Sequence, residues 1–500
     1  IRSTYLVNTP NFVACHVQAY LRMYDVTRGL QKNGTFLLNT IWNEEELAKN
    51  LPNKVKRNFA KNNVTVYYIN ATQIAQEIGL GNRTNTILQS AFFRITGVIP
   101  VDLAIEQMKK FIVKSYGKKG EDVVNKNYAA VDRGGEYKQL PVDPSWANLP
   151  DEDAEANNDP AFINQVVRPI NAQAGDDLPV SAFKGREDGT WEQGTAASEK
   201  RGVAAFVPVW NADNCIQCNQ CAYVCPHATI RPFVLDAEEQ AKLPGDVTLL
   251  KAQGKQFDGM GFRIQVDVLD CLGCGNCADI CPAPKGSALA MKPIATQLAK
   301  QAEFDYAVDA TKVAPKKNPM KKTTLKGSQF EQPLLEFSGA CAGCGETPYY
   351  RLASQLFGSD MRIANATGCS SIYTGSTPST PCTTDKNGHG MAWANSLFED
   401  NAEYGMGMAI GVKHIRSRLT AIMNELLGLN IAEELKAPFK AWIEGKEDAD
   451  ASKAATALIL PVLADNKVED ERAKQILAEI ADKKDYLIKK SVWIIGGDGW

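Results

Sequence analysis

The sequence predicts a multidomain α/β protein in which a small, cysteine-rich α+β domain separates two α/β regions. At 500 residues the chain is too long for one hydrophobic core, and its apolar content of 44% is enough to fill several. Stretches typical of strands and of helices alternate near both ends of the chain, as they do in parallel α/β sheets. Eleven of the 13 cysteines fall into three clusters, and such clustering favours metal binding over disulfide bonds.

The first α/β domain is predicted over residues 1–134. From Thr35 the chain reads "TFLLNTIW" and then "NEEELAKNL", and from Val64 it reads "VTVYYIN" and then "ATQIAQEIG". Each pair is a strand-like apolar run followed by a helical pattern. Two such pairs in succession predict a parallel sheet with connecting helices.

Three further segments follow. Residues 135–200 are predicted to be a linker or a strap over the surface, because long apolar runs are scarce there and the acidic stretch "DEDAEANND" begins at Asp151. Residues 201–312 form the cysteine-rich domain. A lysine-rich connector, "KVAPKKNPMKK", then leads into a second α/β region that extends over residues 313–500.

Charge and hydropathy exclude two classes of partner. The formal net charge of −3 gives so large a chain no general attraction to nucleic acid or to a membrane surface. No apolar run approaches the ~20 residues that a membrane-spanning helix needs. The four histidines (His16, His227, His389 and His414) are too scattered for zinc sites, and we interpret them as structural.

Two cysteine runs share the spacing C-x2-C-x2-C-x3-C-P: "CIQCNQCAYVCP" from Cys215 and "CLGCGNCADICP" from Cys271. This spacing is typical of ferredoxin-like domains with two 4Fe-4S clusters, in which the fourth cysteine of each run binds the cluster of the other run. One predicted ligand set is therefore Cys215, Cys218, Cys221 and Cys281, and the other is Cys225, Cys271, Cys274 and Cys277. Structural zinc fits poorly, because a tetrahedral zinc site has no use for the third and fourth cysteine of each run.

The third cluster is incomplete on its own. Cys341 and Cys344 stand in "GACAGCGETP" and Cys369 stands in "ANATGCSSIYTG", which gives three thiolates of the four that a 4Fe-4S cluster takes. Cys382 is the nearest candidate for the fourth. A helix is predicted to begin after this loop, with Thr347 as its N-cap and Pro348 at its first position, so Glu346 either complements the helix dipole or binds a ligand.

The last ten residues, "SVWIIGGDGW", read as an apolar strand that opens into a glycine turn. Such a turn directs a carboxylate and several backbone N–H groups at a ligand beyond the carboxyl end of a parallel sheet. A carboxylate beside phosphate oxygens suits Mg²⁺, and N–H groups suit the phosphates themselves.

Taken in order, these motifs resemble the pyruvate:ferredoxin oxidoreductase family in its long single-chain form. The stretches "NSLFEDNAEYG", "STYLVN", "GTFLLN" and "LPVSAF" add to the resemblance, which covers essentially the whole chain. It implies oxidative decarboxylation of pyruvate with coenzyme A to acetyl-CoA and CO₂, using thiamine diphosphate, Mg²⁺ and three 4Fe-4S clusters. It also implies that the last region, residues 313–500, is the first part of a thiamine-diphosphate-binding α/β domain. It implies ferredoxin or flavodoxin as the partner, and neither nucleic acid nor a membrane. It also implies that the protein is a homodimer in the cytoplasm.

The resemblance also assigns residues. It implies that the diphosphate binds at Gly497, Asp498, Gly499 and Trp500, with Asp498 as a Mg²⁺ ligand. Glu346 and Cys369 resemble thiamine-contacting, catalytic positions. Cys341, Cys344 and Cys369 resemble ligands of the cluster nearest the thiamine, and Asn85 and Asn127 resemble coenzyme A contacts. Because the family's further domains are not in this sequence, we expect a chain truncated at both ends and inactive alone.

Alternatives remain open at this point. The chain could serve a related enzyme acting on another 2-oxoacid, such as 2-oxoglutarate or indolepyruvate. It could also be an electron-transfer module only, although such a carrier would need neither "CAGCGE" nor "GGDGW". A further hypothesis is that a basic stretch attracts an acidic ferredoxin. The stretch consists of Lys312, Lys316, Lys317, Lys321, Lys322 and Lys326. We favour the interpretation that it is a solvated linker.

Overall fold

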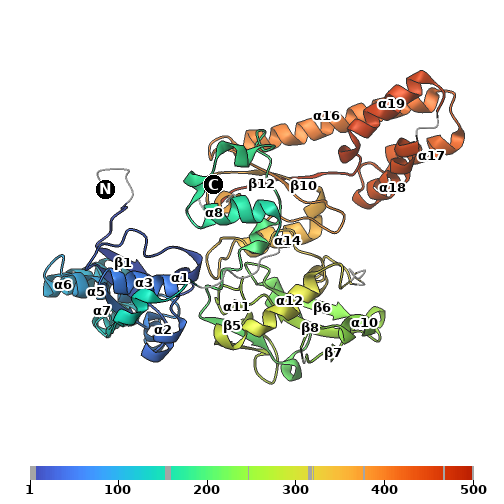
Figure 1. The fold of residues 1–500 in the computed structure, drawn as a ribbon. Helices are drawn as coiled ribbons and strands as arrows, with labels where there is room; N and C mark the ends of the chain where they lie inside the picture. Colours follow the sequence, from blue (N-terminus) through green and yellow to red (C-terminus); the bar gives the residue numbers. More distant parts are fainter. Residues whose placement is uncertain are drawn as a thin grey trace. The chain divides into compact units, whose positions relative to one another are not determined.

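The structure, a computed structural model, describes residues 7–151, 159–245, 247–313, 318, 320–375, 378–465, 468–497 and 500 (Figure 1). The chain divides into two compact units, which are described separately here. The first comprises residues 1–182 with 201–205, and the second comprises residues 183–200 with 206–500. Both units mix helices and strands, which confirms the predicted α/β class. No helix in the described ranges is both long and apolar enough to span a bilayer.

The first unit contains a four-stranded sheet of order β1-β2-β3-β4. Strands β1 (Phe12–Cys15), β2 (Thr35–Asn39) and β3 (Thr65–Ile69) are parallel, and β4 (Lys138–Leu140) is antiparallel to β3. The helices of this unit are α1 (Tyr20–Met23), α2 (Glu44–Asn50), α3 (Asn53–Lys61), α4 (Ala71–Glu77), α5 (Asn85–Thr96), α6 (Val101–Tyr116), α7 (Glu121–Arg133) and α8 (Arg168–Asn171). Strands β2 and β3 and helices α2 and α4 lie where the sequence predicts them.

The two faces of this sheet have separate cores. Phe36 and Leu38 of β2 pack with Phe59 of α3 on one face, whereas Leu37 packs with Ile74 of α4 on the other. Successive side chains of a strand point to opposite faces, so a strand that is covered on both sides must be apolar throughout. This explains why "TFLLN" is an unbroken apolar run.

The cysteine-rich part of the second unit is built on two small antiparallel sheets. One pairs β5 (Phe206–Trp210) with β9 (Leu289–Pro293), and the other has the order β6-β8-β7, with β6 (Ile230–Leu235), β8 (Gly261–Val266) and β7 (Leu250–Lys251). Its helices are short: α9 (Gln220–Tyr223), α10 (Ala237–Ala241), α11 (Asn276–Asp279), α12 (Gln301–Val308) and α13 (Leu325–Ser328).

A three-stranded parallel sheet of order β11-β10-β12 follows in the same unit. Its strands are β11 (Ala392–Asn395), β10 (Met361–Asn365) and β12 (Ser491–Ile495), and helices α14 (Thr347–Phe357) and α15 (Cys369–Thr374) stand on either side of β10 in the chain. The prediction that "SVWII" forms a strand is confirmed by β12.

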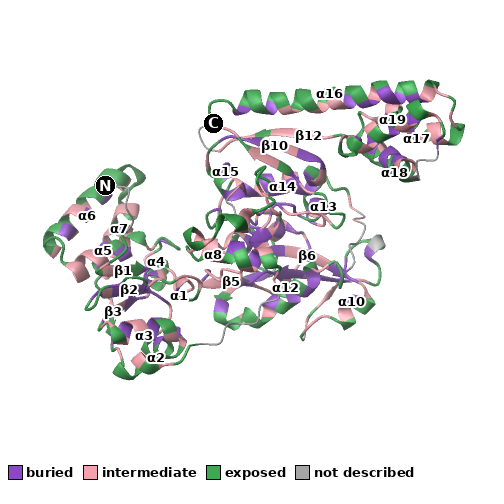
Figure 2. Ribbon diagram, turned by 45° about the horizontal axis from the view of Figure 1, so that its top comes forward, coloured by how far each residue is buried: buried purple, intermediate pink, exposed green. Residues whose placement is uncertain are grey.

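Four helices lie in the chain between β11 and β12: α16 (Asn401–Gly428), α17 (Glu433–Gly445), α18 (Ala449–Asp465) and α19 (Glu471–Asp482). They share a hydrophobic core of their own, in which Leu419 and Ile422 of α16 pack with Trp442 of α17 and Ile476 of α19. Figure 2 shows that the first half of α16 is largely exposed. The four helices therefore pack mainly on one another.

Candidate functional site

The two cysteine runs adopt the same backbone conformation. In the first run, the residues two and four positions after Cys215 are Gln217 and Asn219, with φ of 57° and 62°. In the second run the equivalent residues are Gly273 and Gly275, with φ of 67° and 84°. The N–H groups of Gln217 and Gly273 each donate to the sulfur of the first cysteine of their run at 3.4 Å. Left-handed residues at these positions turn the backbone N–H groups toward the thiols.

The thiols of the two runs form two crossed groups. Burial raises the pKa of Cys221, and the thiolates that raise it further are Cys218, Cys215 and Cys281. Burial likewise raises the pKa of Cys271 to about 12, with Cys225 and Cys274 adding to the effect. The fourth cysteine of each run thus lies with the first three of the other. This is the grouping that the predicted ligand sets require, and ligation itself stays a prediction.

All 13 cysteines are free thiols. Within the described residues, no three His, Cys, Asp or Glu side chains converge closely enough to hold a single metal ion. The thiolates of a cuboidal 4Fe-4S cluster bind four different iron atoms, so they do not need to converge on one point.

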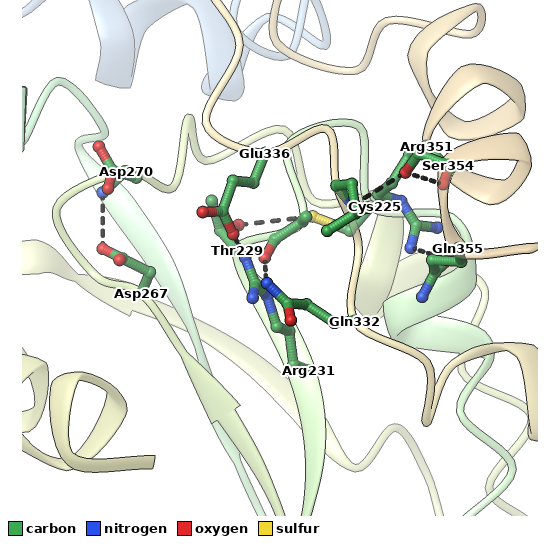
Figure 3. A network of polar contacts seen from close by, with 12 residues as sticks. Cys225, Thr229, Arg231, Asp267, Asp270, Gln332, Glu336, Arg351, Ser354 and Gln355 are labelled. Atoms are coloured by element: carbon green, nitrogen blue, oxygen red, sulfur yellow. Dashed lines mark hydrogen bonds and ion pairs between the residues drawn. The ribbon is translucent and has the colours of Figure 1, made fainter. Parts of the chain in front are cut away.

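Polar side chains that the sequence did not single out surround the second group of thiols (Figure 3). The hydroxyl of Thr229 lies 3.4 Å from the sulfur of Cys225. Asp270, which directly precedes Cys271, and Asp267 both contact the ammonium of Lys200, at 2.8 and 2.5 Å. No local pattern in the sequence marks these residues, because their partners lie far along the chain.

The third cysteine cluster lies on the loop before α14 and at the start of α15. Cys341 and Cys344 are joined by a turn, in which the N–H of Cys344 donates to the carbonyl of Cys341 at 3.1 Å. Cys369 is the first residue of α15, and both it and Cys341 are exposed. The predicted start of α14 is wrong by one residue, because Thr347 is already helical and Glu346 occupies the N-cap position. A proline is accepted equally at the first and second helical positions, so the pattern could not separate the two starts.

Tyr373 of α15 joins this cluster to Glu346. Its hydroxyl donates to Glu346 Oε1 at 3.2 Å. Burial raises the pKa of Tyr373, and the nearby Glu346, Cys344 and Cys369 raise it further. Glu346 makes no capping hydrogen bond to its own helix, so its contact with Tyr373 is what positions it.

Cys382 lies in a different environment. It forms an antiparallel bridge with Leu335 and is buried in the apolar core around Ile363 and Met391. Its pKa is raised to about 12 by burial alone, with no contribution from another cysteine. The suggestion that Cys382 completes the third cluster gains no support from this placement.

The third cluster's loop contacts the ferredoxin-like part directly. Gly343, between Cys341 and Cys344, lies against Cys274, because a Cβ atom added to Gly343 would be 3.6 Å from the Cβ of Cys274. Nε2 of His227, two residues after Cys225, lies 3.2 Å from the carbonyl oxygen of Cys341. Both cysteine runs therefore touch the loop that carries the third cluster.

The glycine turn after β12 packs against the start of α15. A Cβ atom added to Gly497 would lie 3.2 Å from the backbone nitrogen of Cys369. The fully buried Asn365, at the end of β10, donates from Nδ2 to Ser370 Oγ at 2.9 Å and to the carbonyl of Ile495 at 3.3 Å. Asn365 thus holds both turns together, although the sequence analysis did not select it.

Other predicted residues lie apart from this region or outside what the structure describes. Asp498 and Gly499 fall outside the described residues, and Trp500 donates from Nε1 to the carbonyl of Phe398 at 2.9 Å. In the first unit, Asn85 is exposed at the start of α5, and Asn127 is buried in α7 with its amide donating to Val123 O at 2.8 Å. A cleft of about 550 Å³ in that unit is lined by residues that include Trp42, Tyr68 and Arg133, but by neither asparagine.

The predicted basic stretch is only partly described, because Lys316 and Lys317 fall outside the described residues. Lys326 donates to Gln253 Oε1 at 3.2 Å. Burial lowers the pKa of Lys326, and the thiolates of Cys218 and Cys215 oppose that shift. Lys326 therefore lies beside the first group of thiols.

Three family descriptions match successive parts of the chain. "Pyruvate ferredoxin/flavodoxin oxidoreductase" matches residues 1–137, a domain of unknown function matches residues 150–204, and "4Fe-4S dicluster domain" matches residues 208–282. The last of these covers the first cysteine run and the second as far as Pro282.

Full-length relatives are similar over the entire chain. It is 49% identical to pyruvate:ferredoxin oxidoreductase of Moorella thermoacetica and 46% identical to pyruvate-flavodoxin oxidoreductase of Klebsiella pneumoniae, with 100% of this chain and 42% of each relative covered. It is also 41% identical to mitochondrial pyruvate dehydrogenase [NADP(+)] of Euglena gracilis, covering 100% of this chain and 27% of that relative. The chain thus spans less than half the length of the relatives that it matches. Over its whole length the chain is similar to a part of pyruvate:ferredoxin oxidoreductase and pyruvate-flavodoxin oxidoreductase.

Proposed function

We propose that this chain supplies the electron-transfer part and a cofactor-binding part of an enzyme that oxidatively decarboxylates pyruvate. Pyruvate and coenzyme A give acetyl-CoA and CO₂, and the electrons leave one at a time through three 4Fe-4S clusters to ferredoxin or flavodoxin. The observation that carries the proposal is the close approach of Gly343 to Cys274, where a Cβ atom added to Gly343 would lie 3.6 Å from the Cβ of Cys274. It joins the loop of the third cluster to a thiol of the second run, as a relay from one cluster to the next requires.

The names of the relatives support pyruvate over other 2-oxoacids. The Moorella, Klebsiella and Euglena proteins are all named for pyruvate, although the acceptors in their names differ. The acceptor proposed here, ferredoxin or flavodoxin, follows the first two, which have the higher identity.

The residues present fit the proposed cofactors. Two groups of four thiols suit two 4Fe-4S clusters, and the N–H groups of Gln217 and Gly273 offer hydrogen bonds to cluster-binding sulfurs. Three free thiols, Cys341, Cys344 and Cys369, are available to the third cluster. Any side chain at Gly497 would crowd the start of α15, so the glycine turn after β12 lies directly against Cys369.

When bound, thiamine diphosphate supplies the carbanion chemistry of 2-oxoacid decarboxylation and the clusters supply one-electron transfer. The chain's own residues bind and orient these groups. We propose that Glu346, held by Tyr373, contacts the thiamine, that Gly497, Asp498, Gly499 and Trp500 bind the diphosphate, and that Asp498 binds Mg²⁺. Asn85 and Asn127 are proposed as coenzyme A contacts on the resemblance alone, as are the homodimer and the cytoplasmic location.

Anaerobic reconstitution of the chain with iron and sulfide tests the electron-transfer part. The expected content is about eight iron atoms in the ferredoxin-like part, with two interacting paramagnetic centres after reduction. Zinc, or a single cluster, would contradict the proposal. In the enzyme purified anaerobically from its source, we expect reduction of ferredoxin that depends on pyruvate and on coenzyme A. Clusters that form without any pyruvate-dependent reduction would instead indicate an electron-transfer module only.

A further inference from the structure

Arg351 is a buried cation without an acidic partner. It lies on α14 with 2% of its surface exposed. Its Nη1 donates to the amide oxygens of Gln329 and Gln355, both at 2.9 Å, and its Nη2 donates to the carbonyl of Tyr223 at 2.6 Å. Its Nε has no hydrogen-bond partner among the described residues. A buried guanidinium held only by neutral groups is costly, because burying a charge without a counter-charge loses its hydration.

Neighbouring buried cations are paired. Arg231 forms an ion pair with Glu336, and Arg263 forms one with Glu303 at 2.5 Å. Among the described residues, no carboxylate lies within ion-pair distance of Arg351. Its counter-charge must therefore be of another kind.

The side chain that most offsets the effect of burial on Arg351 is that of Cys225. Figure 3 shows Arg351 beside Cys225, and the carbonyl that Arg351 binds belongs to Tyr223, two residues before that cysteine. Burial lowers the pKa of Arg351 to about 10, and the Cys225 thiolate is the main group that opposes this shift. Cys225 belongs to the thiol group that includes Cys271, Cys274 and Cys277.

We propose that Arg351 is the buried counter-charge of the cluster held by Cys225, Cys271, Cys274 and Cys277, and that it raises the reduction potential of that cluster. The inference rests on the proposed function, because it needs the cluster to be present. A cluster bound by four thiolates is anionic, and each added electron makes it more so. A fixed positive charge in a buried site therefore stabilises the reduced form more than the oxidised form.

The position of Arg351 suits the proposed direction of electron flow. Helix α14 begins directly after Cys344 and Glu346, at the third cluster, and carries Arg351 into contact with the segment before Cys225. A higher potential at the cluster beside Arg351 makes it a better acceptor for electrons that arrive from the third cluster. The first group of thiols, with Cys281, has Lys326 near it but no buried arginine among the interactions described.

The test measures the potential of each cluster in the reconstituted chain by redox titration followed by electron paramagnetic resonance. In Arg351→Met, one cluster should become at least tenfold harder to reduce at a fixed potential, which is a negative shift of about 59 mV for one electron. The other ferredoxin-type cluster should keep its potential. The shifted cluster should be the one whose signal Cys271→Ser alters. Arg351→Lys keeps the charge and should restore most of the potential.

Gln355→Glu provides a second route that leaves Arg351 in place. It puts a carboxylate where an amide oxygen now lies 2.9 Å from Nη1, so it should shift the same cluster in the same direction even if Arg351→Met fails to fold. Arg416→Met is the matched control, because Arg416 is also buried and donates to the carbonyls of Tyr486 and Leu487, but in the core of α16–α19. It should leave both potentials unchanged.

The outcomes separate the inference from the proposed function. If the unmodified chain fails to assemble two clusters, the proposed function fails. If both clusters assemble and neither Arg351→Met nor Gln355→Glu moves a potential, the inference is overturned. It is also overturned if both clusters shift equally, or if Arg416→Met has the same effect.

Discussion

Burial raises the pKa of Cys274, and the backbone N–H of Gly343 opposes that rise, although the two residues belong to different cysteine clusters. A Cβ atom added to Gly343 would lie 3.6 Å from the Cβ of Cys274, so the two backbones are in close contact. Gly343 also has φ of +74°, a conformation that favours glycine. Both the close approach and the conformation point to this residue as the junction between the third cluster and the ferredoxin-like part.

Gly343→Ala should destabilise this junction through its backbone. The space for a methyl group is adequate, so the main cost is the left-handed conformation, about 1–2 kcal/mol in the free energy of unfolding. Denaturant unfolding of the chain measures it. Gly339→Ala is the matched control, because Gly339 has no atom within 4 Å of an added Cβ and no positive φ. Equal losses in the two variants would show that the junction is not special.

Cys281→Ser should impair the cluster of the first run rather than that of its own run. The reason is that the Cys281 thiolate lies with Cys221 and raises its pKa, whereas Cys271 and Cys274 have Cys225 beside them. Site-resolved paramagnetic NMR of the reduced chain distinguishes the clusters. Cys225→Ser should have the reciprocal effect. Loss of the second-run cluster in Cys281→Ser would disprove the crossed arrangement.

Lys200→Met should be strongly destabilising. The fully buried carboxylate of Asp267 would lose the ammonium that lies 2.5 Å from it, at a cost of about 3–5 kcal/mol. Lys242→Met, which breaks an exposed pair with Glu238, is the control and should have a far smaller effect. Similar unfolding midpoints for both variants would contradict the role given to Lys200.

The same ammonium predicts the direction of a pH effect. Burial alone would lower the pKa of Lys200, but Asp270 and Asp267 outweigh it and raise the pKa above its usual range. A raised pKa means that the folded state holds the proton more tightly than the unfolded state. The stabilisation is therefore complete below the ordinary lysine pKa of about 10.4 and is lost as the pH rises further. The difference in the free energy of unfolding between the chain and Lys200→Met should therefore disappear at strongly alkaline pH. Near neutral pH the difference should have its full size.

Tyr373→Phe should release Glu346 without disturbing the core. It removes the hydroxyl that donates to Glu346 at 3.2 Å, for a loss of about 1 kcal/mol in stability. If Glu346 contacts the thiamine, binding of thiamine diphosphate to the purified enzyme should weaken as well, as measured by calorimetry. Tyr349→Phe, on an exposed tyrosine of α14, should change neither. Unaltered binding in Tyr373→Phe would mean that Glu346 needs no positioning by this residue.

Cys382→Ala should leave the third cluster intact. The Cys382 thiol is buried in an apolar core, and no other cysteine affects its pKa. Iron analysis and spectroscopy of the purified enzyme test this, with Cys344→Ala as the variant that should lose the third cluster. A third cluster that disappears in Cys382→Ala would identify Cys382 as its missing ligand.

The sequence predicts those features whose cause is local. An unbroken apolar run such as "TFLLN" is what a strand covered on both faces needs, and both "TFLLN" and "SVWII" are strands. The spacing of the cysteine runs likewise determines which thiols a single loop can bring together. Glu346 could be selected because it stands beside a predicted helix start, and Cys369 because it is a clustered cysteine in a motif that resembles the family's.

Features that depend on distant partners could not be predicted. Arg351 stands in "PYYRLASQLF", where a charged residue in a helix would ordinarily face solvent. It is buried because Tyr223 and Gln329, on other segments, supply its hydrogen bonds. Asn365, the last residue of β10, and Thr229, just before β6, are similar cases. The partners of such a single polar residue cannot be identified from the local sequence, because they come from other segments of the chain.

The parallel pairing of β10 with β12 has a consequence for how the protein is made. Asn365 and Ile495 are register partners, yet 130 positions of sequence separate them, and helices α16–α19 are synthesised in between. Those helices have a core of their own and can fold early. The start of α15, which bears Cys369, acquires its neighbour Gly497 only after β12 has been synthesised, because pairing between distant segments must wait for both. Cys369 and Gly497 therefore come together only after helices α16–α19 have been made.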